Sequence, residues 1–449
     1  MLRIEQPQAY RVFPQDEAGR AEIAVRVVGE SDRMQARLVS GGEEVVPWTS
    51  LEPEKGKAWA GTLRAPMGGP YRLEVWGNGT ARVSGLLVGD LWITAGQSNA
   101  DGVGALSEAE RPSRLVNAFY YDDRWGRAEE PLCWYNEATD PVHWGVGAAM
   151  REEAARNDRN FRVYGAGPAV AFGNALSRAT GVPVGLIVCS HGGTSMDQWS
   201  PSLRGEGGKS LYGSLLRRVA AVGGRVRGCI WYQGESDTMV EDAKDYRAKM
   251  RDFVATLRRD LGNPEMPLAW VQIGKFYGGD PSWAWAWDLV QDQQVRMDIS
   301  GELGRAAMVP AIDLELCDAI HVGSRGQRIL GRRLAEVAYA LMHGGELPWG
   351  PRPAGAKLEA DGRTIRVRFT GRPLARASRV WGFTVEVEGR PVPLAGCRVD
   401  RKDPHTVVVR LAAPAQGETR LWYGQGFNPV VSLRDERGRP CPVFGPVTV

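Results

Sequence analysis

Four short polar segments carry side chains that could perform nucleophilic catalysis. They are Gly-Gln-Ser-Asn at 96–99, His-Gly-Gly-Thr at 191–194, Gln-Gly-Glu-Ser-Asp at 233–237 and Asp-Ala-Ile-His at 318–321. A serine hydroxyl is a weak nucleophile until a neighbouring base accepts its proton, and a histidine oriented by an aspartate can serve as that base. The four segments together therefore predict attack by a serine, assisted by a histidine, on an electrophilic carbon.

Ser98 is the candidate nucleophile. Gly96 permits a tight turn that would expose the Ser98 hydroxyl at the end of a strand. Taken alone, Ser98 could instead cap a helix or a turn. The residues around it do not form a Gly-x-Ser-x-Gly elbow, because Ala100 occupies the place of the last glycine, and this argues against an ordinary α/β-hydrolase.

The candidate base is His321, one of five histidines in the chain. Asp318 lies three residues earlier, a spacing that lets its carboxylate bond one ring nitrogen while the other faces the serine. Asp313 is the second choice for this orienting acid. His191 is a competing base, because it follows another predicted strand. The remaining histidines lie in a tryptophan-rich segment, at a helix end and in the C-terminal β region: His143, His343 and His405.

The oxyanion that develops in such a reaction needs hydrogen-bond donors aimed at it. The candidates are the backbone N–H groups of Ser98 and Gly193 and the side-chain amide of Gln233. Gly193 suits this role because a missing Cβ lets the backbone approach a ligand closely. Glu235 and His191 lie on the same two segments, and each is assigned a structural or substrate-binding role. For Glu235, the role of a second catalytic acid is the alternative.

The elements that position these segments alternate between strands and helices. Strand-length apolar runs lie at 91–95, 184–189, 226–232, 268–273 and 306–312. Helices are predicted at 245–261 and 324–342, where apolar residues recur on one face. This alternation predicts an α/β fold with a parallel sheet covered on both faces. Ligands of such sheets gather at the carboxyl ends of the strands, where the four polar segments lie.

The flanking segments are predicted to be β structure. Residues 1–87 and 348–449 show strand-like alternation broken by turn residues, without a helical period. A chain of 449 residues exceeds the ~250–300 residues at which single cores stop growing. We therefore predict an N-terminal β domain at 1–87, a catalytic α/β domain at 88–347 and a C-terminal β domain at 348–449.

Charge and cysteine usage exclude several function classes. The 56 Lys and Arg residues nearly balance the 53 Asp and Glu residues, which gives no case for a nucleic-acid partner or an anionic membrane surface. The six cysteines show neither a disulfide framework nor metal-ligand spacing. No apolar run is long enough to span a membrane, and residues 1–20 lack the apolar core of a signal peptide. Because a leader removed before the numbering would leave the same pattern, no compartment is assigned.

The four motifs resemble those of the sialate O-acetylesterase family. This family belongs to the SGNH-hydrolase superfamily and is related to carbohydrate-esterase acetylxylan esterases. The resemblance covers the middle of the chain, and its most specific block is Trp-Tyr-Gln-Gly-Glu-Ser-Asp at 231–237. Residues 88–92 and 421–442 are similar to the family more loosely. Ala100 departs from the pattern, because many relatives carry Met there, and this leaves the exact substrate open.

The resemblance implies a three-layer α/β/α SGNH-hydrolase core flanked by N-terminal and C-terminal β domains. Ser98 would be the nucleophile, His321 the base and Asp318 its partner. Gly193 and Gln233 would line the oxyanion hole together with Ser98. The implied reaction is removal of acetyl groups from a carbohydrate, without metal or cofactor.

Two alternatives remain open from the sequence. One is an acetylxylan or other short-chain esterase with the same catalytic residues. The other is a non-catalytic carbohydrate-binding protein, in which some of the 16 tryptophans would serve as sugar platforms. In an enzyme, the sugar would lie near His191, Trp199 and the tryptophan-rich segment 283–287. The sequence does not determine the oligomeric state.

Overall fold

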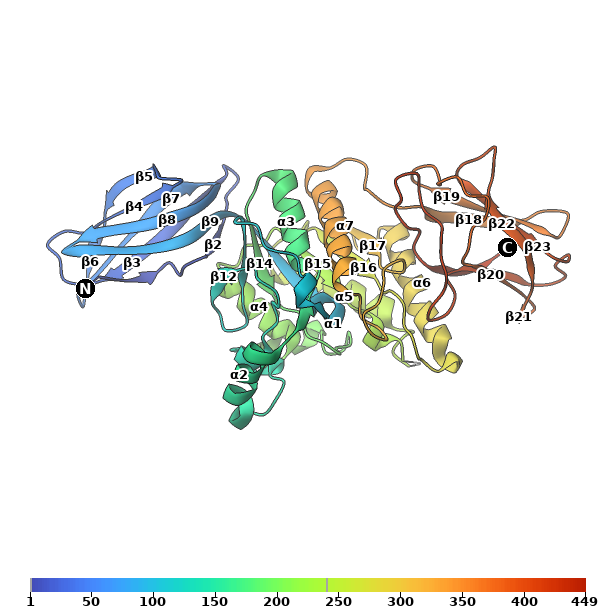
Figure 1. The fold of residues 1–449 in the computed structure, drawn as a ribbon, viewed down its shortest axis with the longest axis horizontal. Helices are drawn as coiled ribbons and strands as arrows, with labels where there is room; N and C mark the ends of the chain where they lie inside the picture. Colours follow the sequence, from blue (N-terminus) through green and yellow to red (C-terminus); the bar gives the residue numbers. More distant parts are fainter. Residues whose placement is uncertain (1, 240) are drawn as a thin grey trace.

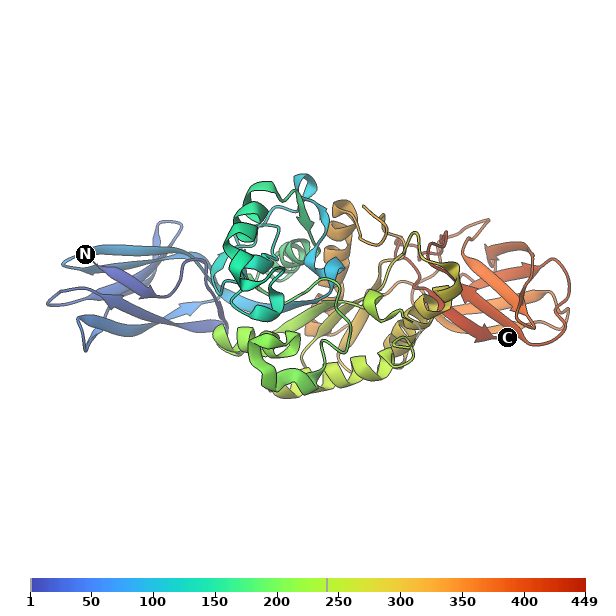
Figure 2. The same ribbon diagram turned by 90° about the horizontal axis from the view of Figure 1, so that it is seen from below.

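Three parts of the molecule follow one another along its long axis (Figure 1). The computed structural model describes residues 2–239 and 241–449. A β part lies at each end and a mixed α/β part lies between them, and a view turned by 90° shows the same linear order (Figure 2). None of the helices in these residues is long and apolar enough to cross a membrane.

The N-terminal part consists of two packed sheets. One has the order β1-β3-β7-β6, and the other joins β5, β4, β8, β9 and β2. Alternate residues of β3, from Ala21 to Val27, point into the core between the sheets. The strands are β1 Arg3–Gln6, β2 Val12–Pro14, β3 Arg20–Val28, β4 Gln35–Ser40, β5 Glu43–Ser50, β6 Glu52–Glu54, β7 Ala58–Pro66, β8 Gly68–Gly77 and β9 Gly79–Gly96.

Strand β9 links the N-terminal part to the central sheet. Its first half pairs antiparallel with β8, and its second half lies parallel between β14 and β15. The boundary predicted between residues 87 and 88 therefore falls inside a continuous strand. The three-domain division stays a prediction, and β9 is the structural element that crosses its first boundary.

The central sheet has the order β12-β11-β14-β9-β15-β16-β17. All its neighbouring strands run parallel except β12, which is antiparallel to β11. From β9 the chain builds one side of the sheet and then crosses to build the other, so the end of β9 lies at the topological switch point. The new strands are β11 Val116–Phe119, β12 Trp125–Arg127, β14 Val184–Val188, β15 Gly228–Tyr232, β16 Leu268–Gln272 and β17 Ala306–Pro310.

All five strands predicted for the central part are present, although β9 is much longer than the predicted run at 91–95. The short strands β11 and β12 were not predicted. Two further short strands, β10 Gly104–Ala105 and β13 Tyr164–Ala166, pair with each other near the site described below.

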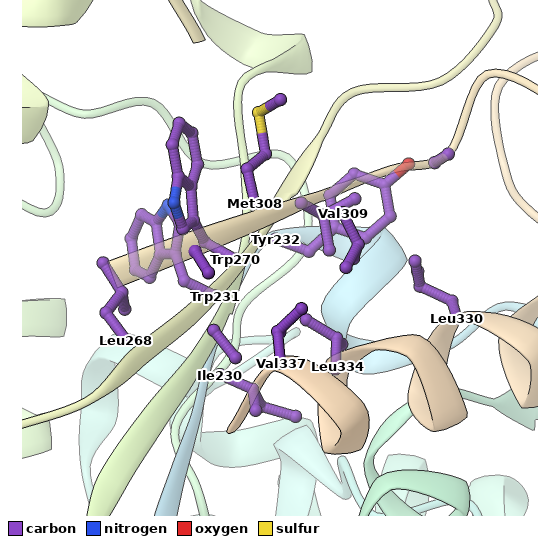
Figure 3. Close-up of a cluster of buried hydrophobic side chains, with 14 of the residues drawn as sticks. Ile230, Trp231, Tyr232, Leu268, Trp270, Met308, Val309, Leu330, Leu334 and Val337 are labelled. Carbon is purple, nitrogen blue, oxygen red and sulfur yellow. The ribbon is translucent and has the colours of Figure 1, made fainter. Parts of the chain in front are cut away.

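Helices cover both faces of the central sheet. On one face, Trp92 of β9 packs edge-on against Phe172 with ring centroids 5.0 Å apart, and Ile230 belongs to the same buried cluster as Leu334 and Val337 (Figure 3). On the other face, Trp231 packs 4.5 Å from Phe253. The helices are α1 Ser98–Asp101, α2 Arg151–Phe161, α3 Ala169–Thr180, α4 Leu211–Ala221, α5 Tyr246–Asp260, α6 Ala284–Ser300 and α7 Ser324–His343.

This three-layer α/β/α arrangement confirms the predicted fold class. The helices predicted at 245–261 and 324–342 are α5 and α7, with ends within one residue of the prediction. Their apolar faces were readable because each helix buries only one side against the sheet.

The C-terminal part contains two four-stranded sheets, ordered β18-β19-β23-β22 and β21-β20-β24-β25. A buried ion pair joins it to the central part: Arg352 donates to Asp298 of α6 at 2.7 Å, and both side chains are at most 3% exposed. The strands are β18 Arg352–Leu358, β19 Thr364–Thr370, β20 Phe383–Val387, β21 Arg390–Pro391, β22 Leu394–Val399, β23 Thr406–Leu411, β24 Thr419–Tyr423 and β25 Phe444–Thr448.

We predict that Arg352→Met lowers the free energy of unfolding by about 3–5 kcal/mol, because it leaves the Asp298 carboxylate buried without its partner. Arg366→Met is the matched control. Arg366 pairs with Asp400 at a more exposed place, with 37% and 15% side-chain exposure, and its loss should cost about 1 kcal/mol or less. Urea denaturation followed by tryptophan fluorescence measures both changes. Equal losses in the two variants would contradict the anchoring role of Arg352.

Candidate active site

The turn after β9 brings three loops together at Gly96. The Gln97 N–H donates to the Tyr232 carbonyl at 2.9 Å, and the His191 N–H donates to the Gly96 carbonyl at 2.9 Å. Gly96 has a φ of +127°, and a Cβ there would lie 2.1 Å from the Tyr232 carbonyl oxygen. Only glycine fits this approach, so the sequence can turn here and begin α1 with Ser98.

Ser98, His321 and Asp318 are hydrogen-bonded in series. The Ser98 Oγ lies 2.9 Å from the His321 Nε2, although the two residues are 223 positions apart in the chain. The His321 Nδ1 lies 2.7 Å from the Asp318 Oδ2. The structure thus brings together the predicted nucleophile, base and orienting acid. Ser98 and His321 are half-buried at the carboxyl edge of the sheet, and Asp318 is exposed.

The Asp318 carboxylate is held by its own loop. Its Oδ1 accepts hydrogen bonds from the Ile320 N–H at 2.9 Å and from the His321 N–H at 2.7 Å. Partial burial raises the pKa of Asp318, but these bonds and the bond to the His321 ring outweigh burial, so the net pKa lies below its ordinary value. An ionised Asp318 fixes the His321 Nδ1 as a donor and leaves Nε2 free to accept the serine proton.

The Gly192-Gly193 turn lies beside Ser98. A Cβ on Gly192 would be 3.6 Å from the Ser98 Cβ, and Gly193 adopts a φ of +69° at the exposed tip. Within residues 2–239 and 241–449, the backbone N–H groups of Ser98 and Gly193 have no hydrogen-bond acceptor. Two free backbone donors next to the serine oxygen match the requirement for stabilising an oxyanion.

The amide hydrogens of Gln233, which are predicted to face the oxyanion, have protein partners. Its Nε2 donates to the Thr194 carbonyl at 3.1 Å and to the Asp237 Oδ2 at 2.6 Å, so both of its hydrogens are already used. Gln233 instead ties the Gly192-Gly193 loop to its own loop. Burial raises the pKa of Asp237 to about 6.

Asn99 is a site residue whose role the motifs do not predict. Its Oδ1 accepts a hydrogen bond from the Val322 N–H at 2.9 Å, and its Nδ2 donates to the Ile320 carbonyl at 3.3 Å. These two bonds bracket His321. The same Nδ2 donates to the Glu235 Oε1 at 2.8 Å. Asn99 therefore fixes the backbone that carries the histidine.

Glu235 lies beneath the serine turn and is 6% exposed. Burial raises its pKa, against the effect of the hydrogen bond from Asn99. Of the roles left open for Glu235, this position favours the structural one. Gln97 joins the same region, because its Oε1 accepts from the Gly234 N–H at 3.3 Å and from the Ser236 N–H at 3.1 Å.

Asp101 and Tyr135 support the Gly192-Gly193 turn from behind. The Gly192 N–H donates to the Tyr135 hydroxyl at 2.7 Å, and this hydroxyl donates to Asp101. Burial raises the pKa of Asp101 to about 6. His191 stacks on the Tyr135 ring with centroids 4.5 Å apart. No motif spacing pointed to Asp101 or Tyr135, because residues 101, 135 and 192 meet only in the folded chain.

Other candidate residues have partners away from a substrate. The second-choice acid Asp313 forms ion pairs with Arg333 at 2.8 Å and with Arg434 at 3.0 Å rather than with His321. Trp199 and Trp287, near which the sugar is expected, are 0% and 1% exposed and pack in the core, so neither ring offers a stacking surface. The remaining tryptophans of segment 283–287 differ from each other: Trp283 packs on Phe276 and Phe427, and Trp285 is 43% exposed.

A parallel α/β sheet that carries serine, histidine and aspartate in hydrogen-bonded series defines the class of serine esterases and related hydrolases. A family model described as carbohydrate esterase, sialic acid-specific acetylesterase, matches residues 88–340. Since this is more than half of the 449 residues, the chain belongs to that family of carbohydrate esterases. The membership confirms the resemblance carried by the four motifs, and it makes the protein a carboxylic ester hydrolase by family.

Individual relatives agree with the family. The chain is 29% identical over 260 residues to a probable carbohydrate esterase of Arabidopsis thaliana, which covers 55% of this chain and 89% of that protein. It is 26% identical over 180 residues to the sialate O-acetylesterase of Homo sapiens, which covers 36% of this chain and 34% of that protein. A solved carbohydrate acetylesterase from Xanthomonas citri matches 97% of both chains with a TM-score of 0.67 at 21% identity, so the two share a fold over their full lengths.

We predict that Asn99→Ala lowers kcat by about 10- to 100-fold, because the backbone around His321 loses two hydrogen bonds that position the base. Asn117→Ala is the matched control. Asn117 is also buried and donates to two carbonyls, those of Tyr10 and Gly85, but it lies at the junction with the N-terminal part. Steady-state kinetics with 4-nitrophenyl acetate test this prediction. An Asn99 variant with the kcat of the Asn117 variant would contradict it.

Proposed function

We propose that this protein hydrolyses O-acetyl esters on a carbohydrate, with Ser98 as nucleophile, His321 as general base and Asp318 as its orienting acid. The observation that carries the proposal is the series of two contacts, 2.9 Å from the Ser98 Oγ to the His321 Nε2 and 2.7 Å from the His321 Nδ1 to the Asp318 Oδ2. A non-catalytic carbohydrate-binding protein would need none of these three groups in this order.

In the proposed reaction, His321 accepts the Ser98 proton while Oγ attacks the acetyl carbonyl. The backbone N–H groups of Ser98 and Gly193 stabilise the negative charge on the carbonyl oxygen. His321 then gives its proton to the departing sugar oxygen, which leaves an acetyl group on Ser98. A water molecule, activated by His321 in the same way, releases acetate and restores the serine.

The proposed substrate is an acetylated sugar of the sialate type. The family description names sialic acid-specific acetylesterases, and the human relative is a sialate O-acetylesterase. Ala100 is half-buried directly after the Ser-Asn pair, and it is the position at which this chain departs from the motif pattern of the family that it resembles. We expect the small Ala100 side chain to leave more space for the substrate beside the serine.

We predict that Ser98→Ala lowers kcat by about 10⁴-fold or more, because the variant lacks the hydroxyl that attacks the acetyl carbonyl. Acetate release from 4-nitrophenyl acetate and from acetylated sugars measures the loss. A thermal melt of the variant serves as its folding control. Full activity in a folded Ser98→Ala variant would refute the assignment.

Variants of Asp318 and Asp313 should distinguish a catalytic role from a stabilising one. Asp318→Ala removes the acceptor of the His321 Nδ1–H, and we expect kcat to fall by about 10³- to 10⁴-fold with little change in melting temperature. Asp313→Ala breaks ion pairs with Arg333 and Arg434, and we expect a lower melting temperature with kcat within about threefold of the unmodified protein. The reverse pattern would make Asp313 the orienting acid.

A panel of O-acetylated sialic acids and acetylated xylo-oligosaccharides determines the substrate class. We expect the highest kcat/KM with an acetylated sialic acid. A clear preference for the xylo-oligosaccharides would leave the catalytic residues unchanged but replace the substrate.

A further inference from the structure

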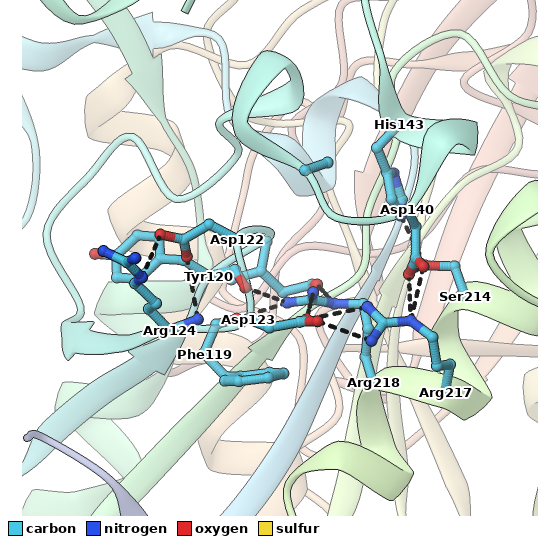
Figure 4. A network of polar contacts seen from close by, with 12 residues as sticks. Phe119, Tyr120, Asp122, Asp123, Arg124, Asp140, His143, Ser214, Arg217 and Arg218 are labelled. Carbon is cyan, nitrogen blue, oxygen red and sulfur yellow. Dashed lines mark hydrogen bonds and ion pairs between the residues drawn. The ribbon is translucent and has the colours of Figure 1, made fainter. Parts of the chain in front are cut away.

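A buried chain of hydrogen bonds leads from Asp140 to His191, the residue directly before the Gly192-Gly193 turn. The chain passes through Ser214 of α4 and through His143, which is 1% exposed. Figure 4 shows Asp140, Ser214 and His143 together with Arg217 and Arg218. Neither the proposed reaction nor the packing of the core requires these polar groups to be connected in this order.

The direction of donation along the chain follows from its charged end. Arg217 pairs with Asp140 at 2.7 Å, and the Asp140 carboxylate accepts hydrogen bonds but donates none. Ser214 therefore gives its single hydroxyl hydrogen to the Asp140 Oδ2, 2.6 Å away. The Ser214 oxygen can then only accept from the His143 Nε2, 3.1 Å away, so this nitrogen carries a hydrogen.

The tautomers of both histidines follow from this direction. Burial lowers the pKa of His143 well below its ordinary value and lowers that of His191 to about 4, so both rings are neutral near pH 7. A neutral His143 with its hydrogen on Nε2 has a lone pair on Nδ1. The His143 Nδ1 lies 3.2 Å from the His191 Nδ1, so His191 must carry its hydrogen on Nδ1 and a lone pair on Nε2.

The His191 ring is held in place by Tyr135. It stacks on Tyr135 with an interplanar angle of 27°, and the Tyr135 hydroxyl accepts from the neighbouring Gly192 N–H. His191 is half-buried, and within residues 2–239 and 241–449 its Nε2 has no hydrogen-bond partner. The structure therefore holds a fixed acceptor on the residue directly before the Gly192-Gly193 turn, and the backbone N–H of the same residue donates to the Gly96 carbonyl of the serine turn.

We propose that the His191 Nε2 accepts a hydrogen bond from a free hydroxyl of the sugar close to its acetyl ester, and that the chain from Asp140 through Ser214 and His143 keeps this nitrogen an acceptor. The inference rests on the proposed function and adds a specificity determinant to it. His191 would thereby select acetyl esters carried on a polyhydroxylated ring over simple acetate esters.

The test compares kcat/KM for a monoacetylated sugar with kcat/KM for 4-nitrophenyl acetate, which has no hydroxyl to donate. In His191→Asn, the amide nitrogen can still donate to the His143 Nδ1, but no acceptor remains at the Nε2 position. We expect the ratio of sugar to nitrophenyl ester to fall by about 10- to 100-fold. His191→Gln, whose amide reaches the Nε2 position, should recover part of the ratio.

Two further variants test the chain and the specificity of the effect. Ser214→Ala removes the link that orients His143, and we expect a smaller fall in the same ratio. His343→Asn makes the same substitution at the end of α7, where His343 packs on Tyr339, and should leave the ratio unchanged. Nitrogen-15 NMR of the imidazoles provides a readout without substrate, with the hydrogen expected on Nδ1 of His191 and on Nε2 of His143.

Each other outcome overturns the inference. An equal loss on both substrates in His191→Asn would leave the ratio unchanged and give His191 a role in shaping the site. Unchanged kcat/KM values for both substrates would remove His191 from substrate recognition. A hydrogen on the His191 Nε2 would reverse the deduced direction. If the unmodified protein released acetate from nitrophenyl acetate but from no sugar, this inference and the carbohydrate assignment would both fail, while Ser98→Ala would still test the nucleophile.

Discussion

The hydrogen bonds of the peptide between Gly96 and Gln97 hold the active-site loops at one point. The Gly96 carbonyl accepts from the His191 N–H, and the Gln97 N–H donates to the Tyr232 carbonyl. These bonds continue the ladders of β9 with its two parallel neighbours, β14 and β15. Because β9 lies at the switch point of the sheet, the loops on its two sides diverge there, which is where open α/β sheets bind their ligands.

Buried amide side chains extend this arrangement from the sheet to the loops. Asn99 secures the segment that carries His321, Gln97 secures the loop after β15, and Gln233 joins that loop to the Gly192-Gly193 turn. Each of these amides uses backbone groups of another loop as partners. Such bonds are worth most in a region with little water, where an unpaired polar group costs roughly 1–3 kcal/mol. The position of His321 relative to Ser98 therefore depends on many bonds outside the catalytic series.

Burial also determines how the titratable groups behave. Glu235, Asp237 and Asp101 all lie behind the reacting surface, and burial raises the pKa of each. Asp318 lies at the surface, where the hydrogen bonds of its own loop lower its pKa. The contrast separates carboxyl groups that support the loops from the one that orients the base, since an orienting acid must stay ionised to hold the histidine tautomer. Burial also keeps His143 and His191 neutral. Because a neutral ring has one donor nitrogen and one acceptor nitrogen, the hydrogen position on His143 fixes the hydrogen position on His191.

Sequence alone determined the elements whose signals are local. The helices α5 and α7 were readable from their apolar faces and the core strands from their apolar runs, and the spacing of Asp318 and His321 within one loop predicted their contact. The partners of Gln233 and Asp313 and the burial of Trp199 were decided only by the tertiary structure, and so was the connection from Asp140 to His191. Each of these features depends on which of several chemically suitable groups lies nearest in the folded protein. The type of a side chain does not determine that distance.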